Sequence, residues 1–315
     1  MKILITGCAG FIGINFTKYW LAEHRGDEVV GVDCLTYAAN LDELSRVREN
    51  PAFVFYKADI SGAQSVNSIF EREKPDTVLN FAAESHVDRS IASAEIFIRS
   101  NVLGTQCLLD ACLRYGVRRF HQISTDEVYG DLPLDSAEQF TEDSPLKPSS
   151  PYSASKAAAD LLVLSYFRTH GLFVTVSRSS NNYGPYQHTE KLIPHTVDAI
   201  RRGEDVSIYG NGQNIRDWLY VHDHVTAVEA ILQNGRAGEI YNVGGGEELT
   251  NLEVVGYIMS AYENCKSKIK FVEDRKGHDR KYSLDTSKIR KQLGWKPQNS
   301  FREQIKSVVL AQLLR

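Results

Sequence analysis

Short apolar segments alternate with amphipathic ones through the first half of the chain. Six apolar segments show little polar alternation, which is typical of strands buried on both faces; they are residues 2–6, 28–33, 53–60, 77–83, 119–124 and 173–179. Helical spacing of apolar residues is found between them, at residues 11–23, 40–49, 62–73, 93–115 and 152–170. This order predicts an α/β fold with a doubly wound parallel sheet covered by helices on both faces.

The second half of the chain is less regular. Turns rich in Gly and Asn, at residues 209–214 and 242–248, separate short apolar segments. No repeat, low-complexity tract or long linker divides the two halves, so we expect interleaved domains. We place the large sheet domain at residues 1–178, with a returning segment near 213–243, and a smaller C-terminal domain mainly at 179–315.

Two predicted helices, residues 93–115 and 152–170, carry apolar side chains around more than one face. Such a helix needs a second surface to cover it. We expect a homodimer that packs through these two segments, because an exposed apolar patch marks an interface. Burial under the smaller domain is the alternative.

Composition narrows the class of protein. Of the 315 residues, 42% are hydrophobic and 24% charged, as in a folded globular protein. The net charge of −4 provides no basic field, so we expect neither nucleic acid nor a membrane surface as partner. The N-terminus lacks a signal-like apolar region, and the five cysteines form no CxxC pair, so we expect a cytoplasmic protein.

The segment KILITGCAGFIG, residues 2–13, joins a predicted strand to a helix through a glycine-rich turn. Gly7, Gly10 and Gly13 would let a pyrophosphate approach the backbone at the helix N-terminus, where free N–H groups attract anions. Asp33 ends the next strand roughly 20 residues later, where a carboxylate accepts ribose hydroxyls and repels a 2′-phosphate. The pattern predicts a Rossmann-type site for NAD in preference to NADP, and a tight turn without a ligand is the alternative.

Two further segments carry candidate chemistry. Tyr152 and Lys156 form a YxxxK pair on one helix face, and a nearby ammonium favours the phenolate that can take a proton from an alcohol. In isolation, a buried Tyr beside a solvated Lys would also fit. The segment QISTDEVYG, residues 122–130, ends a strand and then places Thr125, Asp126 and Glu127 in succession, either as a solvated acidic loop or as two acids that face one substrate.

Longer motifs extend along most of the chain. They are NFAAESHVDRS (80–90), STDEVYG (124–130), SPYSASK (150–156), SNNYGPYQ (180–187), EKLIP (190–194), IYGNGQNIRDWLYVHDH (208–224) and DRKGHDRKYSLD (274–285). On these motifs the sequence resembles the extended short-chain dehydrogenase/reductases and, within them, the nucleoside-diphosphate-glucose 4,6-dehydratases. The resemblance is strongest to those that act on dTDP-glucose.

The resemblance implies an internal redox cycle that ends in loss of water. Tyr152 would act as base while NAD oxidises C4 of the sugar, with Lys156 tuning it and Thr125 orienting the 4-hydroxyl. Glu127 would then remove the C5 proton, and protonated Asp126 would donate to the departing C6 hydroxyl before hydride returns to C6. Adjacent carboxyls push each other's pKa values apart, which gives the acid and the base their opposite protonation states.

The resemblance also implies two sets of binding residues. The NAD site would contain Gly7, Gly10, Phe11, Ile12, Gly13, Asp33, Cys34, Leu35, Thr36, Asp59, Ile60, Phe81, Ala82, Ala83, Glu84, Ser85, Ser100, Tyr152, Lys156 and Asn182. The substrate site would contain Ser85, Thr125, Asn181, Lys191, Leu192, Tyr209, Arg216, Asn251, Arg275 and His278. We expect no metal site, because His222 and His224 lack a third ligand at a suitable spacing.

Other functions stay open at this point. A UDP-sugar 4,6-dehydratase would share all of these features. A sugar-nucleotide 4-epimerase or decarboxylase of the same fold would need NAD and the Tyr/Lys pair, but not the adjacent Asp and Glu. A non-catalytic NAD-binding regulator would fit the fold, although the intact Thr125, Tyr152 and Lys156 argue against it.

Overall fold

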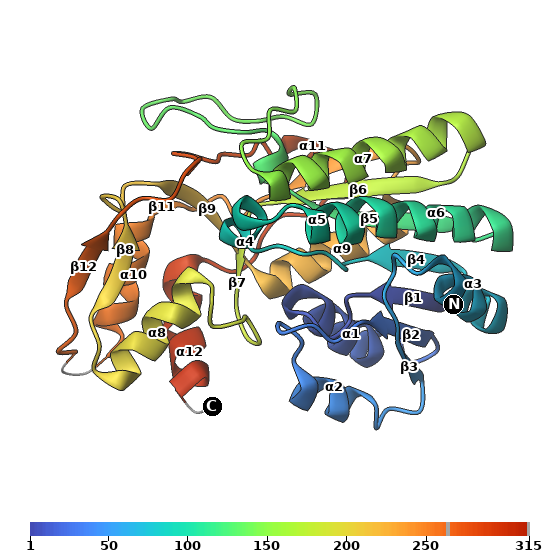
Figure 1. The fold of residues 1–315 in the computed structure, drawn as a ribbon, viewed down its shortest axis with the longest axis horizontal. Coiled ribbons are helices and arrows are strands. Elements are labelled where there is room, and N and C mark those ends of the chain that lie inside the picture. Colours follow the sequence, from blue (N-terminus) through green and yellow to red (C-terminus); the bar gives the residue numbers. More distant parts are fainter. Residues whose placement is uncertain (263–264, 314–315) are drawn as a thin grey trace.

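The computed structural model describes residues 1–262 and 265–313, and its largest element is a parallel sheet. The strands are β1 (Lys2–Thr6), β2 (Glu28–Asp33), β3 (Phe53–Lys57), β4 (Thr77–Asn80), β5 (Arg119–Thr125), β6 (Val174–Ser179) and β10 (Glu239–Val243). They pair in parallel in the order β10-β6-β5-β4-β1-β2-β3 (Figure 1). The predicted doubly wound α/β fold is confirmed.

Helices cover both faces of this sheet. On one face lie α3 (Ala63–Glu73), α6 (Gly104–Tyr115) and α7 (Pro151–His170); on the other lie α1 (Phe11–Glu23), α2 (Leu41–Val47) and α9 (Val221–Asn234) (Figure 1). Each face has its own apolar core: Leu4 of β1 packs in one, and its neighbours Ile3 and Ile5 pack in the other. Burial on both faces explains why the strands show little polar alternation.

Helix α7 has clear sequence signals at both ends. The Ser150 side chain accepts a hydrogen bond from the N–H of Ser153 at 3.1 Å, and Pro151 occupies the first helical position. Gly171, with φ of 68°, ends the helix in the left-handed conformation. The helix between these two ends carries Tyr152 and Lys156 and packs against β5, where Lys156 contacts Ile123.

The segment predicted as one helix at 93–115 is not continuous. It consists of α5 (Glu95–Phe97), a π-helical turn η1 (Ile98–Leu103) and α6, and the short α4 (Val87–Ala92) precedes it. A π-helical turn inserts an extra residue into the helical repeat and turns the side chains that follow. Here the turn places Asn101 in the interior, where it contacts the neighbouring Glu84 and Ser155.

The second half of the chain forms two small sheets and returns to the large one. β7 (Asn181–Tyr183), β9 (Ile215–Tyr220) and β11 (Glu248–Thr250) form one small sheet, and β8 (Val206–Tyr209) pairs with β12 (Ile269–Val272) in the other. These two small sheets share one apolar core with the helices α8 (Leu192–Arg202), α10 (Asn251–Ser260) and α12 (Phe301–Leu313). Between these elements α9 packs on α1, β10 pairs with β6, and α11 (Ser287–Leu293) contacts both α9 and β10.

The arrangement places the carboxyl ends of β1, β4 and β5 toward the smaller sheets (Figure 1). The strand order reverses between β1 and β4, and doubly wound sheets bind ligands at such a point, outside the carboxyl ends of the strands. No helix in the described part of the chain combines the length and the apolarity needed to cross a bilayer.

Candidate active site and cofactor site

The glycine-rich turn after β1 is packed too closely for a side chain at Gly7 or Gly13. Gly7 has φ of 66°, and a Cβ on it would lie 2.6 Å from the backbone nitrogen of Ala82. A Cβ on Gly13 would lie 2.1 Å from the carbonyl oxygen of Gly7. The turn therefore brings bare backbone to the N-terminus of α1, where Gly10 is the N-cap and supplies no side chain of its own.

Asp33, the last residue of β2, lies beside this turn. Its carboxylate accepts hydrogen bonds from the N–H of Ala9 at 3.0 Å and from the N–H of Leu35 at 2.8 Å. Burial raises the pKa of Asp33, whereas these two N–H groups lower it. The carboxylate is thus fixed in place, and its oxygens have lone pairs left to accept hydrogen bonds from hydroxyl groups.

Two adjoining cavities, of about 270 Å³ and about 100 Å³, follow the carboxyl edge of the sheet. Of the predicted NAD residues, the larger cavity is lined by Gly7, Gly10, Phe11, Ile12, Gly13, Phe81, Ala83, Ser85, Tyr152, Lys156 and Asn182. The smaller one is lined by Gly7, Gly10, Asp33, Cys34, Thr36, Asp59, Ile60, Phe81, Ala82, Ala83, Glu84 and Ser100. Leu35 lines neither cavity, because its side chain packs against the core beneath α1.

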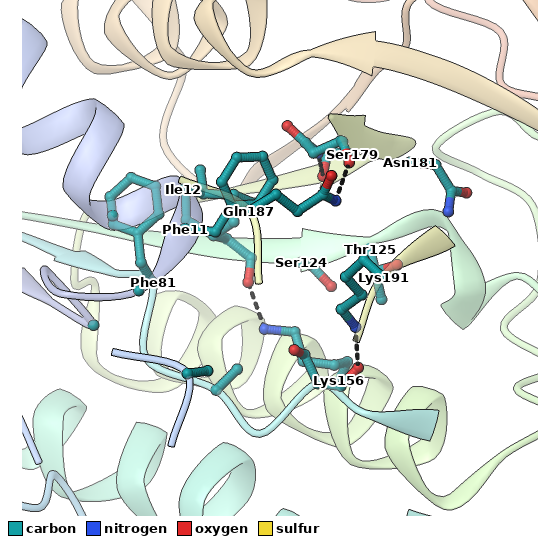
Figure 2. A pocket seen from close by; sticks show the side chains of 18 of the residues that line it. Phe11, Ile12, Phe81, Ser124, Thr125, Lys156, Ser179, Asn181, Gln187 and Lys191 are labelled. Carbon is teal, nitrogen blue, oxygen red and sulfur yellow. Dashed lines mark hydrogen bonds between the residues drawn. The ribbon is translucent and has the colours of Figure 1, made fainter. Parts of the chain in front are cut away.

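The candidate catalytic side chains all line the larger cavity. In Figure 2, Phe11 and Phe81 lie toward one side of it, and Thr125 and Lys191 toward the other. Thr125 ends β5, and the single turn η2 (Asp126–Val128) follows directly. The Thr125 hydroxyl accepts from the N–H of Glu127 at 3.3 Å and lies 3.3 Å from Oδ1 of Asp126, so it holds both acids at the end of the strand.

Tyr152 and Lys156 are both buried, and burial shifts their pKa values in opposite directions. Burial and the charge of Glu127 raise the pKa of Tyr152 well above its usual value, while a hydrogen bond with Thr125 lowers it. Burial lowers the pKa of Lys156 to about 8, and the charge of Asp160 opposes that shift. The ammonium of Lys156 donates to the carbonyl of Ile123 at 2.6 Å, and its action on the phenol of Tyr152 stays a prediction.

The two neighbouring acids have different surroundings. Burial, followed by the charges of Glu127 and Asp217, raises the pKa of Asp126 well above its usual value. Oδ2 of Asp126 is buried and has no hydrogen-bond partner within the described residues. Burial also raises the pKa of Glu127, but three cations, Arg275, Lys191 and Arg216, lower it. The pKa of both acids is raised, but that of Asp126 is raised further, which favours Asp126 as the acid of the pair and Glu127 as the base.

The cations around Glu127 come from three separate segments. Lys191 precedes α8 and donates to the carbonyl of Ser85 at 3.2 Å. Arg216, buried on β9, donates to the carbonyls of Ile215 and Asp279, both at 2.8 Å. The Nε of Arg275 is buried without a partner in the described structure. All three cations lower the pKa of Glu127, and Lys191 also lines the larger cavity.

The remaining predicted substrate residues are spread more widely. Asn181, like Ser85, Thr125 and Lys191, lines the larger cavity. Tyr209 and His278 lie edge to face, with ring centroids 6.4 Å apart. Arg216, Arg275, Leu192, Tyr209, Asn251 and His278 line neither of the two cavities.

Sequence reasoning missed several residues of the site. Ser124, Ser179, Ser180, Gln187, His188 and Glu190 also line the larger cavity. Asn101 lies behind it: its Oδ1 accepts from the N–H of Glu84 at 2.9 Å, and its amide donates to Ser155 at 2.8 Å. No local signal singles out Asn101, because the two residues before it, Arg99 and Ser100, are polar as well.

Comparison with known proteins identifies the wider group to which this fold and site belong. The GDP-mannose 4,6 dehydratase family matches residues 4–308. The chain belongs to this family. The resemblance to extended short-chain dehydrogenase/reductases, and within them to sugar-nucleotide 4,6-dehydratases, is confirmed.

Individual relatives cover nearly the whole chain. The dTDP-glucose 4,6-dehydratase of Haemophilus influenzae is 49% identical, over 98% of this chain and 97% of its own length. The crystal structure of DesIV, a dTDP-glucose 4,6-dehydratase from Streptomyces venezuelae with NAD and dTDP bound, has a TM-score of 0.94 and 46% identity, over 99% of this chain and 96% of that one. The UDP-glucose 4-epimerase of Thermotoga maritima, solved with UDP-glucose, has a TM-score of 0.91 at 30% identity, over 99% of this chain and 98% of that one. The family's fold therefore accommodates more than one reaction.

Proposed function

We propose that the chain is an NAD-dependent hydro-lyase that converts dTDP-glucose to dTDP-4-keto-6-deoxyglucose. One observation carries this proposal: Asp126 and Glu127 line the same cavity as Tyr152, in surroundings that favour opposite protonation states. An epimerase has no use for an adjacent acid and base that remove water. The full-length similarity to dTDP-glucose 4,6-dehydratases supports the same conclusion.

The chain's own residues fit NAD. The Gly7–Gly13 turn leaves room for a pyrophosphate where a Cβ would collide, and Asp33 presents a fixed carboxylate to ribose hydroxyls. The two cavities adjoin at Phe81 and Ala83, so a dinucleotide could extend through both. When bound, NAD⁺ would supply the acceptor for the hydride that leaves C4 of the sugar.

The first task of the protein side chains is to remove the 4-hydroxyl proton. Thr125, at the end of β5, would orient this hydroxyl, and Tyr152 would take its proton. The ammonium of Lys156, one helical turn away, would stabilise the phenolate that the buried site otherwise disfavours.

The second task is the removal of water. The 4-ketone acidifies the C5 proton, which the Glu127 carboxylate would accept. Asp126 would donate its proton to the C6 hydroxyl as that group leaves, since the pKa of Asp126 is raised by burial and by Glu127. Lys191, Arg216 and Arg275 would hold the diphosphate and keep Glu127 ionised.

A panel of nucleotide sugars tests the substrate. We expect kcat/KM to be highest for dTDP-glucose when it is compared with UDP-, CDP- and GDP-glucose and with UDP-GlcNAc. A preference for a UDP-sugar would reassign the chain to the UDP-sugar 4,6-dehydratases. Absence of turnover on every member of the panel would contradict an enzymatic role.

We also propose that the chain forms a homodimer through the face made by α5, η1, α6 and α7. Ile98 in η1 and Leu161 in α7 are 57% and 59% exposed, and Ile96 and Leu103 extend this apolar surface. α6 and α7 lie side by side, so two copies would bury their faces as a four-helix bundle (Figure 1).

Two further assignments rest on the same structure. The NAD-binding domain would comprise residues 1–178 with the returning segment near 213–243, since α9 and β10 pack with the large sheet. The sugar nucleotide would bind mainly to residues 179–315. A cytoplasmic location fits the free cysteines, Cys8, Cys34, Cys107, Cys112 and Cys265, because reducing compartments keep thiols unpaired.

A further inference from the structure

A buried ion pair lies directly behind the candidate catalytic residues. Asp160 of α7 and Arg178 of β6 are 0% and 2% exposed. Oδ2 of Asp160 accepts from Nε of Arg178 at 2.9 Å and from the hydroxyl of Ser124, in β5, at 3.0 Å. Neither member of the pair lines either of the two cavities described above.

The strand register explains why these groups meet. Ser124 and Arg178 are paired residues on the neighbouring strands β5 and β6, so their side chains point to the same face, toward α7. Asp160 lies one helical turn after Lys156 on α7. Lys156 donates to the carbonyl of Ile123, and Asp160 accepts from the next residue of the strand, so the two anchor consecutive residues of β5 just before Thr125.

The pair is expensive to bury, so its position calls for an explanation. A guanidinium stays charged under all ordinary conditions, and a buried ion pair is often no more stabilising than apolar side chains of similar size. Arg178 is held on its other side by the ring of Tyr129, 4.8 Å from the guanidinium carbon. Structural stability alone gives little reason for a charged pair at this place.

The charge of Asp160 acts on Lys156. Burial favours the neutral amine of Lys156, and Asp160 is the neighbouring charge that opposes this shift in pKa. The other charged groups at this end of the site are Asp126 and Glu127 on η2 and Arg178 on β6. Tyr152 lies one helical turn before Lys156 on α7, and burial and the charges of Glu127, Asp126 and Asp160 raise its pKa. A neutral Lys156 could not stabilise the phenolate of Tyr152.

We propose that Asp160, paired with Arg178, is a positioning residue that keeps Lys156 as an ammonium ion and fixes the end of β5 that carries Thr125. The proposal rests on the proposed function, because it assigns Lys156 its role in C4 oxidation. It adds a residue that acts on the reaction without contacting the reacting atoms.

The variant Asp160→Asn tests the electrostatic part. Without the carboxylate, and with Arg178 left unpaired, the pKa of Lys156 should fall. The alkaline limb of the pH profile of kcat should then move to lower pH by roughly one unit, the low end of what a neighbouring opposite charge produces. KM for the sugar nucleotide should change little, and Asp160→Glu, which retains the charge, should return the limb toward its original position. An unchanged alkaline limb in folded Asp160→Asn protein would overturn the proposal.

A second variant covers the case in which Asp160→Asn does not fold. Replacing the pair together, with Asp160→Leu and Arg178→Met, leaves no unpaired buried charge and should preserve stability. We expect this double variant to fold with bound NAD and still show the shifted limb, by less than the single variant. Wild-type kcat with a wild-type pH profile in the double variant would mean that the pair is structural only.

A measurement on Lys156 that needs no catalytic turnover tests the role of Asp160 independently of which substrate the protein uses. Competitive acetylation with acetic anhydride, followed by mass spectrometry of the peptide that contains Lys156, measures the pH at which this amine becomes reactive. That pH should be lower in Asp160→Asn than in the wild type, even if dTDP-glucose proves not to be the substrate. Equal values in the two proteins would refute the role of Asp160, whereas a shift without turnover would refute only the proposed function.

Discussion

Two adjacent carboxyls, Asp126 and Glu127, carry the distinctive chemistry at the scale of single residues. They follow each other in sequence, yet the fold surrounds each of them with a different set of charged groups. Arg216 lowers the pKa of both acids, whereas Arg275 and Lys191 lower that of Glu127. Sequence adjacency alone brings the two acids together, but the difference between their pKa values depends on Arg275 and Lys191, which come from distant segments.

The raised pKa of Asp126 predicts that this residue lowers the stability of the folded protein at neutral pH, although dehydration requires it. The folded state holds this proton more tightly than the unfolded chain does, so stability should fall as the pH rises above about 4. Asp126→Asn removes the titration and should raise Tm at neutral pH by about 2 °C or more while it abolishes dehydration. Calorimetry tests this, with Asp135→Asn at an exposed position as the control. A lower Tm for Asp126→Asn would contradict the assigned protonation state.

Glu127→Gln should separate the two halves of the reaction. Oxidation at C4 needs Tyr152 and not Glu127, so bound NADH should still form on mixing with substrate, but solvent deuterium should not enter at C5. In the contrasting Tyr152→Phe variant, the first step itself should slow by about 10²–10⁴-fold, so bound NADH should not accumulate. Absorbance for NADH and mass spectrometry for deuterium give both readings. Undiminished dehydration in Glu127→Gln would remove Glu127 from the mechanism.

Some functional residues could be found from the sequence and others could not. Tyr152 and Lys156 follow from a four-residue spacing on one helix, and the turn at Gly7 follows from its position between a strand and a helix. Asp160 has a similar spacing from Lys156, but its partner Arg178 depends on the register of β5 against β6. Long-range register leaves no local trace in a single sequence.

At the scale of elements, the turn between β1 and α1 should tolerate no side chain at Gly13. Gly13→Ala would force a Cβ to within 2.1 Å of the Gly7 carbonyl, so the turn must shift. We expect loss of bound NAD together with a lower Tm, measured by nucleotide release after denaturation and by calorimetry. Gly26→Ala is the matched control, since a Cβ there meets no atom within 4 Å. Full NAD content in Gly13→Ala would contradict the cofactor site.

The elements themselves were largely predictable, except where the helical repeat changes. Strands buried on both faces and helices with clear caps, such as α7, match their predicted positions closely. The break at η1 was not predicted, because a π-helical turn requires no particular residue types at 98–103 and changes only the direction of the side chains. That change is what buries Asn101 beside the site.

At the scale of the whole molecule, the apolar face on α6 and α7 predicts a dimer. Leu161→Asp would place a charge at the centre of the proposed bundle and should yield monomers, as measured by light scattering. Leu134→Asp is the control, because Leu134 is 41% exposed and lies in the segment between η2 and α7, outside the four elements of the proposed interface. A wild-type protein that is monomeric at micromolar concentration would refute the homodimer.

The proposed function depends most on the removal of water from the sugar nucleotide by Asp126 and Glu127. The direct test is the mass of the product formed from dTDP-glucose in deuterated water. We predict a product lighter than the substrate by one water and carrying solvent deuterium at C5. A product of the same composition as dTDP-glucose would instead make the chain an epimerase and contradict the role assigned to Asp126 and Glu127.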